Sequence, residues 1–217
     1  MTTATVAVLD YGSGNLHSAV RALERTGARV ALTADHSSIA EADGLVVPGV
    51  GAFASVMEGL AAVGGVDLVR RRHAAGQPTL GICVGLQVLF SLGTEHGAHA
   101  DGVGLWPGEV ARLDAPVVPH MGWSRVRAPA ESRLFDGLRE EYFYFVHSFA
   151  ALSGPDHALT TTAVHGVPFV AAVEDGATCA TQFHPEKSGD AGRALLTNWV
   201  RTLTTRPHDH LISEEQQ

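Results

Sequence analysis

The residues Gly-Ile-Cys-Val-Gly at 81–85 join an apolar run, 79–82, to a run with helical spacing, 84–91. A cysteine framed by two glycines between a strand and a helix is the thiol form of the sharp turn that presents a nucleophile. The small flanking residues let the backbone bend and let a substrate carbonyl approach closely. This segment therefore predicts a strand–turn–helix unit that presents Cys83 as a nucleophile at the end of the strand.

The same alternation of strand and helix patterns runs through the first part of the chain. It predicts a mostly parallel central sheet of the flavodoxin-like α/β class, flanked by helices on both faces. After Gly108 the pattern changes to short strands and turns, which predicts an antiparallel extension in the second half. The expected strands are 5–9, 28–32, 45–47, 79–82, 109–113, 122–126, 142–149, 158–163, 167–174 and 178–183, and the expected helices are 16–25, 52–60, 66–73, 84–91 and 191–203.

Length and composition favour one large domain. The chain has 217 residues, 45% hydrophobic and 18% charged, which suffices to bury a core without disulfides or metal, although two small domains stay open. We expect a single domain over 1–205 and a polar, flexible tail over 206–217. Only two cysteines occur, and we see neither a signal peptide nor a run long enough to span a bilayer. These features predict a cytoplasmic protein in a reducing compartment.

The charge pattern argues against a broad nucleic-acid surface, because the formal net charge is −8. The one basic cluster is Arg70-Arg71-Arg72, which we interpret as a solvated helix face, with a local anion or partner contact as the alternative.

A base and its orienting group follow far downstream at His184-Pro185-Glu186. Proline biases His184 toward an extended conformation, in which residues two apart point to the same side of the chain. Glu186 can then hold one imidazole nitrogen while the other faces the thiol of Cys83. The imidazole and the dipole of the following helix are both expected to favour the thiolate. The other cysteine, Cys179, lies in an apolar strand and is interpreted as structural.

Acyl transfer also needs donors for the oxyanion of the tetrahedral intermediate. The backbone amide of Val84, directly after the nucleophile, is one candidate, and the Gly49-Val50-Gly51 loop supplies the second. The glycines on both sides of Val50 suggest that its peptide can flip to complete the oxyanion hole.

These residues together resemble the class I (triad) glutamine amidotransferases, which hydrolyse glutamine through a cysteinyl thioester and release ammonia. The resemblance implies Cys83 as the nucleophile, His184 as the acid/base and Glu186 as its orienting group. It implies that Gly51, Gln87 and Ser148 bind the glutamine substrate, and that no cofactor or metal takes part.

Five motifs narrow the resemblance over nearly the whole chain. They are Asp-Tyr-Gly-Ser-Gly-Asn at 10–15, Val-Pro-Gly-Val-Gly-Ala-Phe at 47–53, Pro-His-Met-Gly-Trp at 119–123, Tyr-Phe-Val-His-Ser at 144–148 and His-Pro-Glu-Lys-Ser at 184–188. They resemble the glutaminase subunits of imidazole glycerol phosphate synthases, from histidine biosynthesis.

That resemblance implies a (β/α)8-barrel cyclase as partner in a heterodimer, with ammonia channelled to it for imidazole glycerol phosphate and AICAR formation. Met121, Trp123 and Lys187 become candidate interface residues, with a core Trp123 and a solvated Lys187 as the alternatives. The family commonly has asparagine where this chain has Ser124, so the shorter hydroxyl is expected to lose a polar contact across the interface.

Several other functions fit single features less well. Gly12-Ser13-Gly14 suggests a dinucleotide fold, but His17 stands where the third glycine is required. Twelve histidines invite a metal site, yet no metal-ligand spacing occurs, and His208 and His210 are expected to be solvated. The glutaminase subunit of another synthase, such as pyridoxal phosphate synthase, stays open, as does a non-catalytic binding subunit.

Overall fold

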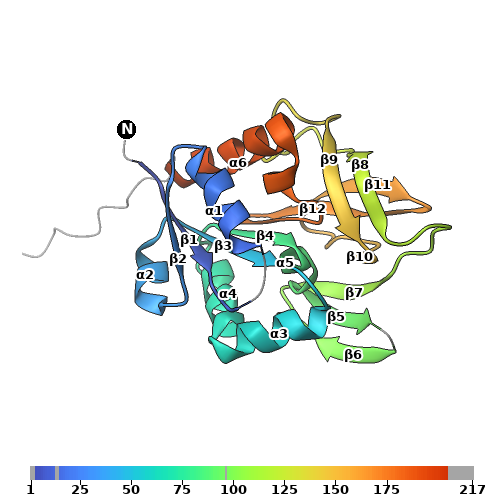
Figure 1. Ribbon diagram of the computed structural model, residues 1–217, viewed down its shortest axis with the longest axis horizontal. Helices are drawn as coiled ribbons and strands as arrows, with labels where there is room; N and C mark the ends of the chain where they lie inside the picture. The colour runs from blue at the N-terminus through green and yellow to red at the C-terminus, as the bar shows by residue number, and fades with distance from the viewer. Residues whose placement is uncertain (1–2, 13–14, 96, 205–217) are drawn as a thin grey trace, which may run out of the picture.

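A seven-stranded sheet forms the centre of the computed structural model, which describes residues 3–12, 15–95 and 97–204 (Figure 1). The strand order is β11-β12-β13-β4-β3-β1-β2. The strands from β13 to β2 are parallel, and β12 and β11 add antiparallel pairs, which confirms the predicted sheet and its extension. The strands are β1 (Thr5–Leu9), β2 (Arg29–Thr33), β3 (Gly44–Gly49), β4 (Thr79–Cys83), β11 (Leu159–His165), β12 (Val167–Asp175) and β13 (Thr178–Thr181).

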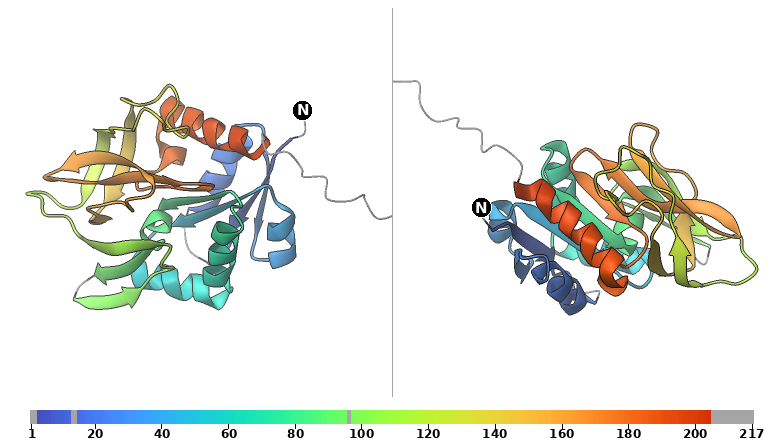
Figure 2. Two further views of the ribbon diagram at one scale, coloured as in Figure 1. Left: turned by 180° about the vertical axis from the view of Figure 1, so that it is seen from behind. Right: turned by 90° about the horizontal axis from the view of Figure 1, so that it is seen from above.

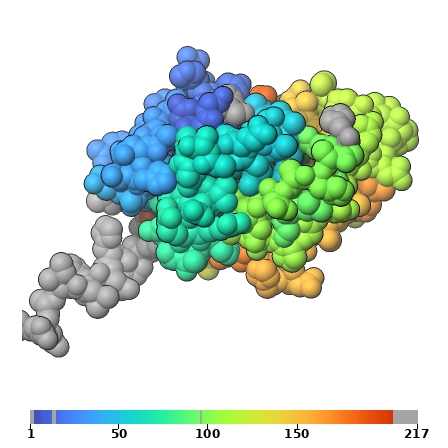
Figure 3. All heavy atoms as spheres, turned by 90° about the horizontal axis from the view of Figure 1, so that it is seen from below, coloured from blue at the N-terminus to red at the C-terminus, as the bar shows by residue number. Residues whose placement is uncertain are grey.

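Helices cover both faces of this sheet, as the alternation predicted (Figures 1 and 2). One face carries α1 (Leu16–Glu24) and α6 (Gly189–Thr204), and the other carries α3 (Phe53–Ala62) and α4 (Gly65–Ala74). Seen from the side of α3 and α4, these two helices form one continuous surface with the strands that follow β4 (Figure 3). A contiguous hydrophobic core runs from Ala4 to Leu203.

The short helix α2 (His36–Glu41) was not predicted from the sequence. Its only buried residue is Ile39, so it has no apolar periodicity to reveal it. The helix is set by its cap instead, because the Asp35 carboxylate accepts a hydrogen bond from the Ser38 amide at 2.8 Å.

The predicted helix at 84–91 is wrong in its second half. The helix α5 (Val84–Gln87) is only four residues long, and the chain enters β5 (Phe90–Glu95) instead. The main chain is diverted because the carbonyl of Leu89 accepts hydrogen bonds from the amides of Leu105 and Trp106, which leads β5 into a second sheet. That sheet has the order β10-β7-β5-β6, with β6 (Ala98–Asp101), β7 (Trp106–Arg112) and β10 (Phe149–Ala151).

A two-stranded antiparallel sheet made of β8 (His120–Arg125) and β9 (Tyr142–His147) completes the fold. It packs against β11, at the end of the central sheet that is remote from β2 (Figure 1). The 3₁₀ turn η1 (Pro185–Lys187) connects the end of β13 to α6 and contacts β9.

The basic cluster at 70–72 is only partly a solvated face. Arg71 is exposed, but Arg72 is 2% exposed, which contradicts the prediction for this residue. Its guanidinium donates to the carbonyls of Ile39 at 3.1 Å and Pro78 at 3.0 Å. The spacing of apolar residues along a helix predicts which positions face inward. It does not predict that backbone carbonyls of other segments lie there and accept hydrogen bonds from a buried arginine.

Two features lie wholly or partly outside the described residues: the Gly-Ser-Gly step at 12–14 and the tail at 206–217. Among the helices that are described, none combines the length and the apolar character needed to cross a membrane.

Candidate active site

Three neighbouring parallel strands end at the same edge of the central sheet and deliver the predicted site residues there. Cys83 is the last residue of β4, Gly49 the last of β3, and His184 follows β13. Parallel strands place their carboxyl ends at one edge, where ligands bind in open α/β sheets. They surround a cavity of about 320 Å³ lined by Val50, Gly51, Cys83, Val84, Gln87, Glu95, Val146, His147, Ser148, Phe149, His184 and Lys187.

The bend between β4 and α5 is made by Cys83 itself. Its backbone has φ 58° and ψ −113°, and it is the one non-glycine residue with positive φ among those described. An L-residue held there costs about 1–3 kcal/mol, a strain that clusters at functional sites.

The two glycines beside Cys83 serve close packing rather than backbone bending. A Cβ on Gly85 would lie 2.0 Å from the carbonyl oxygen of Val47, and one on Gly81 would lie 2.5 Å from the carbonyl of Gly85. A Cβ on Gly49 would lie 2.5 Å from the amide of Gly85. The Gly-x-Cys-x-Gly pattern is therefore required for a different reason than the bend that we expected from the sequence. The turn passes directly against β3, and a Cβ does not fit between the backbone of the turn and the backbone of β3.

His184 and Glu186 form a buried pair beside the thiol. His184 is extended, with φ −100° and ψ 96°, as Pro185 predicts. Its Nδ1 lies 2.7 Å from Oε1 of Glu186, with side chains only 3% and 4% exposed. Burial alone lowers the pKa of His184, but hydrogen bonds to Cys83 and Glu186 and the charges of both residues raise this pKa to about 9.

His184 is therefore a cation at neutral pH and can donate a proton to a group bound beside Cys83. The helix dipole that the sequence suggested contributes little, because α5 has only four residues. The electrostatics of the site come from the His184–Glu186 pair.

Sequence reasoning missed two buried groups near the Cys83 thiol, Gln182 and Tyr11. The amide of Gln182 donates to Sγ of Cys83 at 3.8 Å, and its Oε1 accepts from Nε2 of Gln87 at 3.0 Å. Tyr11 lies close enough that burial and the charge of Cys83 together raise the pKa of its phenol. The Tyr11 hydroxyl donates to the carbonyl of Pro48, at the end of β3. Tyr11 stands inside the motif at 10–15, and Gln182 lies two residues before the motif at 184–188, which was the available signal.

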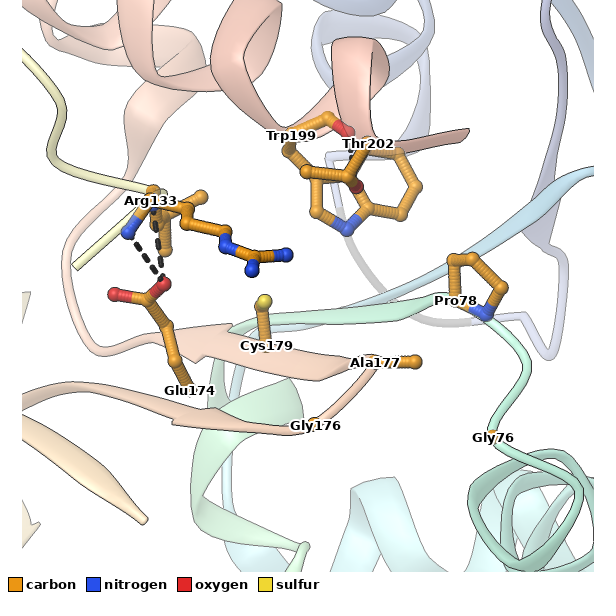
Figure 4. A pocket seen from close by; sticks show the side chains of 10 residues that line it. Gly76, Pro78, Arg133, Glu174, Gly176, Ala177, Cys179, Trp199 and Thr202 are labelled. Atoms are coloured by element: carbon orange, nitrogen blue, oxygen red, sulfur yellow. Dashed lines mark hydrogen bonds between the residues drawn. The ribbon is translucent and has the colours of Figure 1, made fainter. Parts of the chain in front are cut away.

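The second cysteine lies beside a different and larger cavity, of about 510 Å³ (Figure 4). Arg133, Glu174 and Trp199 surround Cys179 there, and none of the described residues that line this cavity is a histidine. Burial, with the charges of Glu174 and Asp175, raises the pKa of the Cys179 thiol. A cysteine without a base and held in its thiol form agrees with a structural role, so cavity size alone would select the wrong site.

A thiol paired with a buried imidazole at the end of a central parallel strand defines an α/β enzyme that works through a cysteine nucleophile. The model of the glutamine amidotransferase class-I family matches residues 7–203. The chain therefore belongs to the class I glutamine amidotransferase family.

Several close relatives of this chain share one name within that family. It is 59% identical over 206 residues to the imidazole glycerol phosphate synthase subunit HisH of Mycobacterium tuberculosis, covering 94% of this chain and all of the relative. The HisH subunit of Renibacterium salmoninarum is 58% identical over 92% of this chain and 95% of its own length. That of Streptomyces coelicolor is 56% identical over 91% and 93%.

Solved structures agree on the fold. The structure of PurLQS from Thermotoga maritima has a TM-score of 0.72 at 16% identity, covering 93% of this chain and all of that one. A glutamine amidotransferase structure has a TM-score of 0.71 at 21% identity, covering 89% and 98%. At these identities the likeness supports the architecture alone.

Proposed function

We propose that this chain is the glutaminase subunit of an imidazole glycerol phosphate synthase and hydrolyses L-glutamine to glutamate and ammonia for histidine biosynthesis. The observation that carries the proposal is the buried Cys83–His184–Glu186 arrangement in a chain 59% identical to HisH subunits. That identity favours this function over the glutaminase subunit of pyridoxal phosphate synthase. The intact triad disfavours a non-catalytic binding subunit.

Each member of the triad has one role in the reaction. The Cys83 thiolate attacks the side-chain carbonyl carbon of glutamine, and the C–N bond breaks as His184 donates its proton to the leaving nitrogen, which departs as ammonia. The remaining thioester is hydrolysed when His184 accepts a proton from water, which releases glutamate and the thiolate. Glu186 holds Nδ1 of His184 and stabilises its charge throughout.

The oxyanion of each tetrahedral intermediate is bound by the backbone amides of Val84 and Val50. Val84 begins α5, so its N–H has no acceptor within the helix. Val50 lines the same cavity, and the next residue, Gly51, has φ +94°, a conformation that favours glycine. The Val50 peptide turns its N–H into the cavity when the partner is active. An identical Val50 orientation in structures of the resting and the stimulated complex would contradict this step.

The glutamine itself is bound by Gly51, Gln87 and Ser148, which line the cavity around Cys83. Gln87 is 3% exposed, and its side chain is fixed by hydrogen bonds to Gln182 and to the carbonyl of Phe149. A buried and oriented amide of this kind suits recognition of a polar substrate better than a mobile surface group does.

The relatives are named as subunits, which implies a partner, and we place that partner on β8. Met121 is 64% exposed and Trp123 54% exposed, as partner anchors require. Lys187, at the rim of the cavity, pairs with an acidic group of the partner. The partner is a (β/α)8-barrel cyclase that receives the ammonia. The proposal includes a cytoplasmic location, which suits two cysteines that both stay free.

The test compares glutamine hydrolysis by this chain alone and with a candidate cyclase and its ribonucleotide ligand. Strong stimulation by the pair is expected, and its absence overturns the assignment to this synthase. Cys83→Ala is expected to abolish glutamine-dependent turnover while the complex still uses added ammonium salts. Cys179→Ala is the matched control and keeps glutamine use. Glutamine turnover by the Cys83→Ala variant would refute the thiol mechanism.

A further inference from the structure

A chain of hydrogen bonds connects the exposed strand β8 with the cavity around Cys83. Oγ of Ser124 lies 2.8 Å from Nε2 of His120, and Nδ1 of His120 lies 3.0 Å from Nε2 of His147. Nδ1 of His147 lies 3.0 Å from the carbonyl oxygen of Phe149. His120 and His147 are 3% and 6% exposed, and their mutual contact is buried, so water does not compete for that central contact.

The same carbonyl oxygen also accepts from Gln87. Nε2 of Gln87 lies 2.9 Å from the oxygen of Phe149 and 3.0 Å from Oε1 of Gln182. The amide of Gln182 then donates to Sγ of Cys83 at 3.8 Å. The contacts therefore continue without a gap from Ser124 to the nucleophile.

The direction of the hydrogen bonds follows from the carbonyl group, which can only accept. His147 must donate from Nδ1, so its Nε2 carries the lone pair and accepts from Nδ1–H of His120. Nε2 of His120 then carries a lone pair, and the Ser124 hydroxyl must donate to it. In both His120 and His147, Nδ1 therefore donates a hydrogen bond and Nε2 accepts one.

The histidines are suited to this arrangement because both are neutral at physiological pH. Burial, with repulsion from His165, lowers the pKa of His120 to about 4. Burial also lowers the pKa of His147 to about 3, helped by repulsion from His120, His165 and His184. A neutral imidazole has one donor and one acceptor, which is what a directed chain needs.

The plane of the central ring is fixed by its neighbours. His120 is stacked on His165 at 4.2 Å and on Phe145 at 4.9 Å between ring centroids. Within that plane its two nitrogens reach only His147 and Ser124. The ring can change its tautomer, but it has little freedom to change its partners.

We infer that Ser124, His120 and His147 are positioning residues: their directed hydrogen-bond chain holds the Phe149 carbonyl, and through it Gln87 and Gln182, in place around Cys83. This inference rests on the proposed function only for the identity of the substrate. Ser124, which replaces the family's usual asparagine, thus acts through its hydrogen bond to His120 within this subunit. An asparagine side chain can also donate to His120, so the direction would be conserved.

The first test needs no assay of activity. Two-bond ¹H–¹⁵N NMR spectra of the imidazoles in the full-length chain should show the Nδ1–H tautomer for both His120 and His147. An Nε2–H tautomer at either residue would contradict the inferred direction of the hydrogen bonds and would overturn the inference. Ser124→Ala should keep Nδ1–H at His120, because the Phe149 carbonyl and His147 set the direction, but should shift the Nε2 resonance of His120, which loses its donor, whereas Ser124→Asn should keep both the tautomer and the Nε2 resonance of a hydrogen-bonded nitrogen.

The second test uses the complex with the cyclase. Ser124→Ala should raise the KM for glutamine roughly 3- to 10-fold, the effect of losing one buried hydrogen bond, with a smaller change in kcat. Ser124→Asn should restore the KM, and ammonium-dependent turnover should be equal in all variants. Ser91→Ala, which removes a hydroxyl donor to the Trp106 carbonyl in the second sheet, is the matched control.

The outcomes separate the two proposals. An unchanged KM in Ser124→Ala, or no rescue by Ser124→Asn, overturns the positioning role. If the unmodified chain hydrolyses no glutamine with any cyclase, the proposed function fails, and the tautomers still decide whether the chain of hydrogen bonds is directed.

Discussion

Gly85 and Val47 are in backbone contact: a Cβ on Gly85 would lie 2.0 Å from the carbonyl oxygen of Val47. This contact holds the Cys83 turn against β3, next to the strand end that continues into Val50. Cys83 and Val50, the proposed nucleophile and second oxyanion donor, are thus set relative to each other by two backbones without intervening side chains.

Gly85→Ala should therefore inactivate the enzyme, because the added methyl group forces Cys83 and Val50 apart. We expect glutamine turnover in the complex to fall by about 100-fold or more, since losing one oxyanion donor alone has this effect. Steady-state kinetics measures it. Gly137→Ala is the control, because its Cβ would meet nothing within 4 Å while φ is +74°. It should lose about 1 kcal/mol of stability and keep its activity. Full activity of Gly85→Ala would show that the contact is dispensable.

The pH dependence of glutamine hydrolysis should follow His184. Its pKa of about 9 means that the imidazolium, the proposed proton donor to the leaving nitrogen, is lost as the pH rises through that value. The alkaline limb of kcat/KM should therefore lie near pH 9. Glu186→Gln removes a charge that raises this pKa, so the limb should move down by roughly one pH unit.

The control for this shift is Glu140→Gln, which neutralises an exposed carboxylate paired with Arg125. Its pH profile should match that of the unmodified chain. NMR titration of His184 provides an independent readout. An alkaline limb at the same pH in the Glu186→Gln and Glu140→Gln complexes would mean that Glu186 does not set the charge of His184.

The buried guanidinium of Arg72 should contribute strongly to stability. Its two nitrogens donate to the carbonyls of Ile39 and Pro78, and a lysine cannot reach both in this geometry. Arg72→Lys should lower the free energy of unfolding by about 1.5–3 kcal/mol, as measured by urea denaturation. Arg71→Lys, on the exposed side of the same helix, should change it by less than about 0.5 kcal/mol. Equal effects at both positions would contradict this account.

Trp123 should anchor the partner subunit. Its ring is half exposed and packs edge-on against Tyr144 at 6.0 Å, while the carbonyl of Tyr144 accepts from the His184 amide at 3.0 Å. Trp123→Ala should weaken cyclase binding by about 2 kcal/mol or more, measured by calorimetry. Leu152→Ala, an equally exposed apolar residue outside β8 and β9, should bind normally. Similar losses in both variants would place the interface elsewhere.

The short-range part of this protein could be predicted from its sequence. Apolar runs and helical spacing predicted the parallel strands and the helices α1, α3, α4 and α6 within a few residues. The Gly-x-Cys-x-Gly turn predicted the bend at Cys83, and the His-Pro-Glu step predicted the pairing of His184 with Glu186. These features are local: each depends on residues within one turn or strand, where spacing alone decides direction.

The tertiary structure decided what depends on contacts between distant segments. Gly85 is required by β3, which passes behind it, and Gly81 by the carbonyl of Gly85, while β5 forms in place of a helix because it pairs with β7 in the second sheet. The burial of Arg72 and the hydrogen bonds from Ser124 to Gln182 join residues that no local pattern relates. Burial removes water as an alternative partner, so the direction of each such bond is fixed only once the sheets have been packed together.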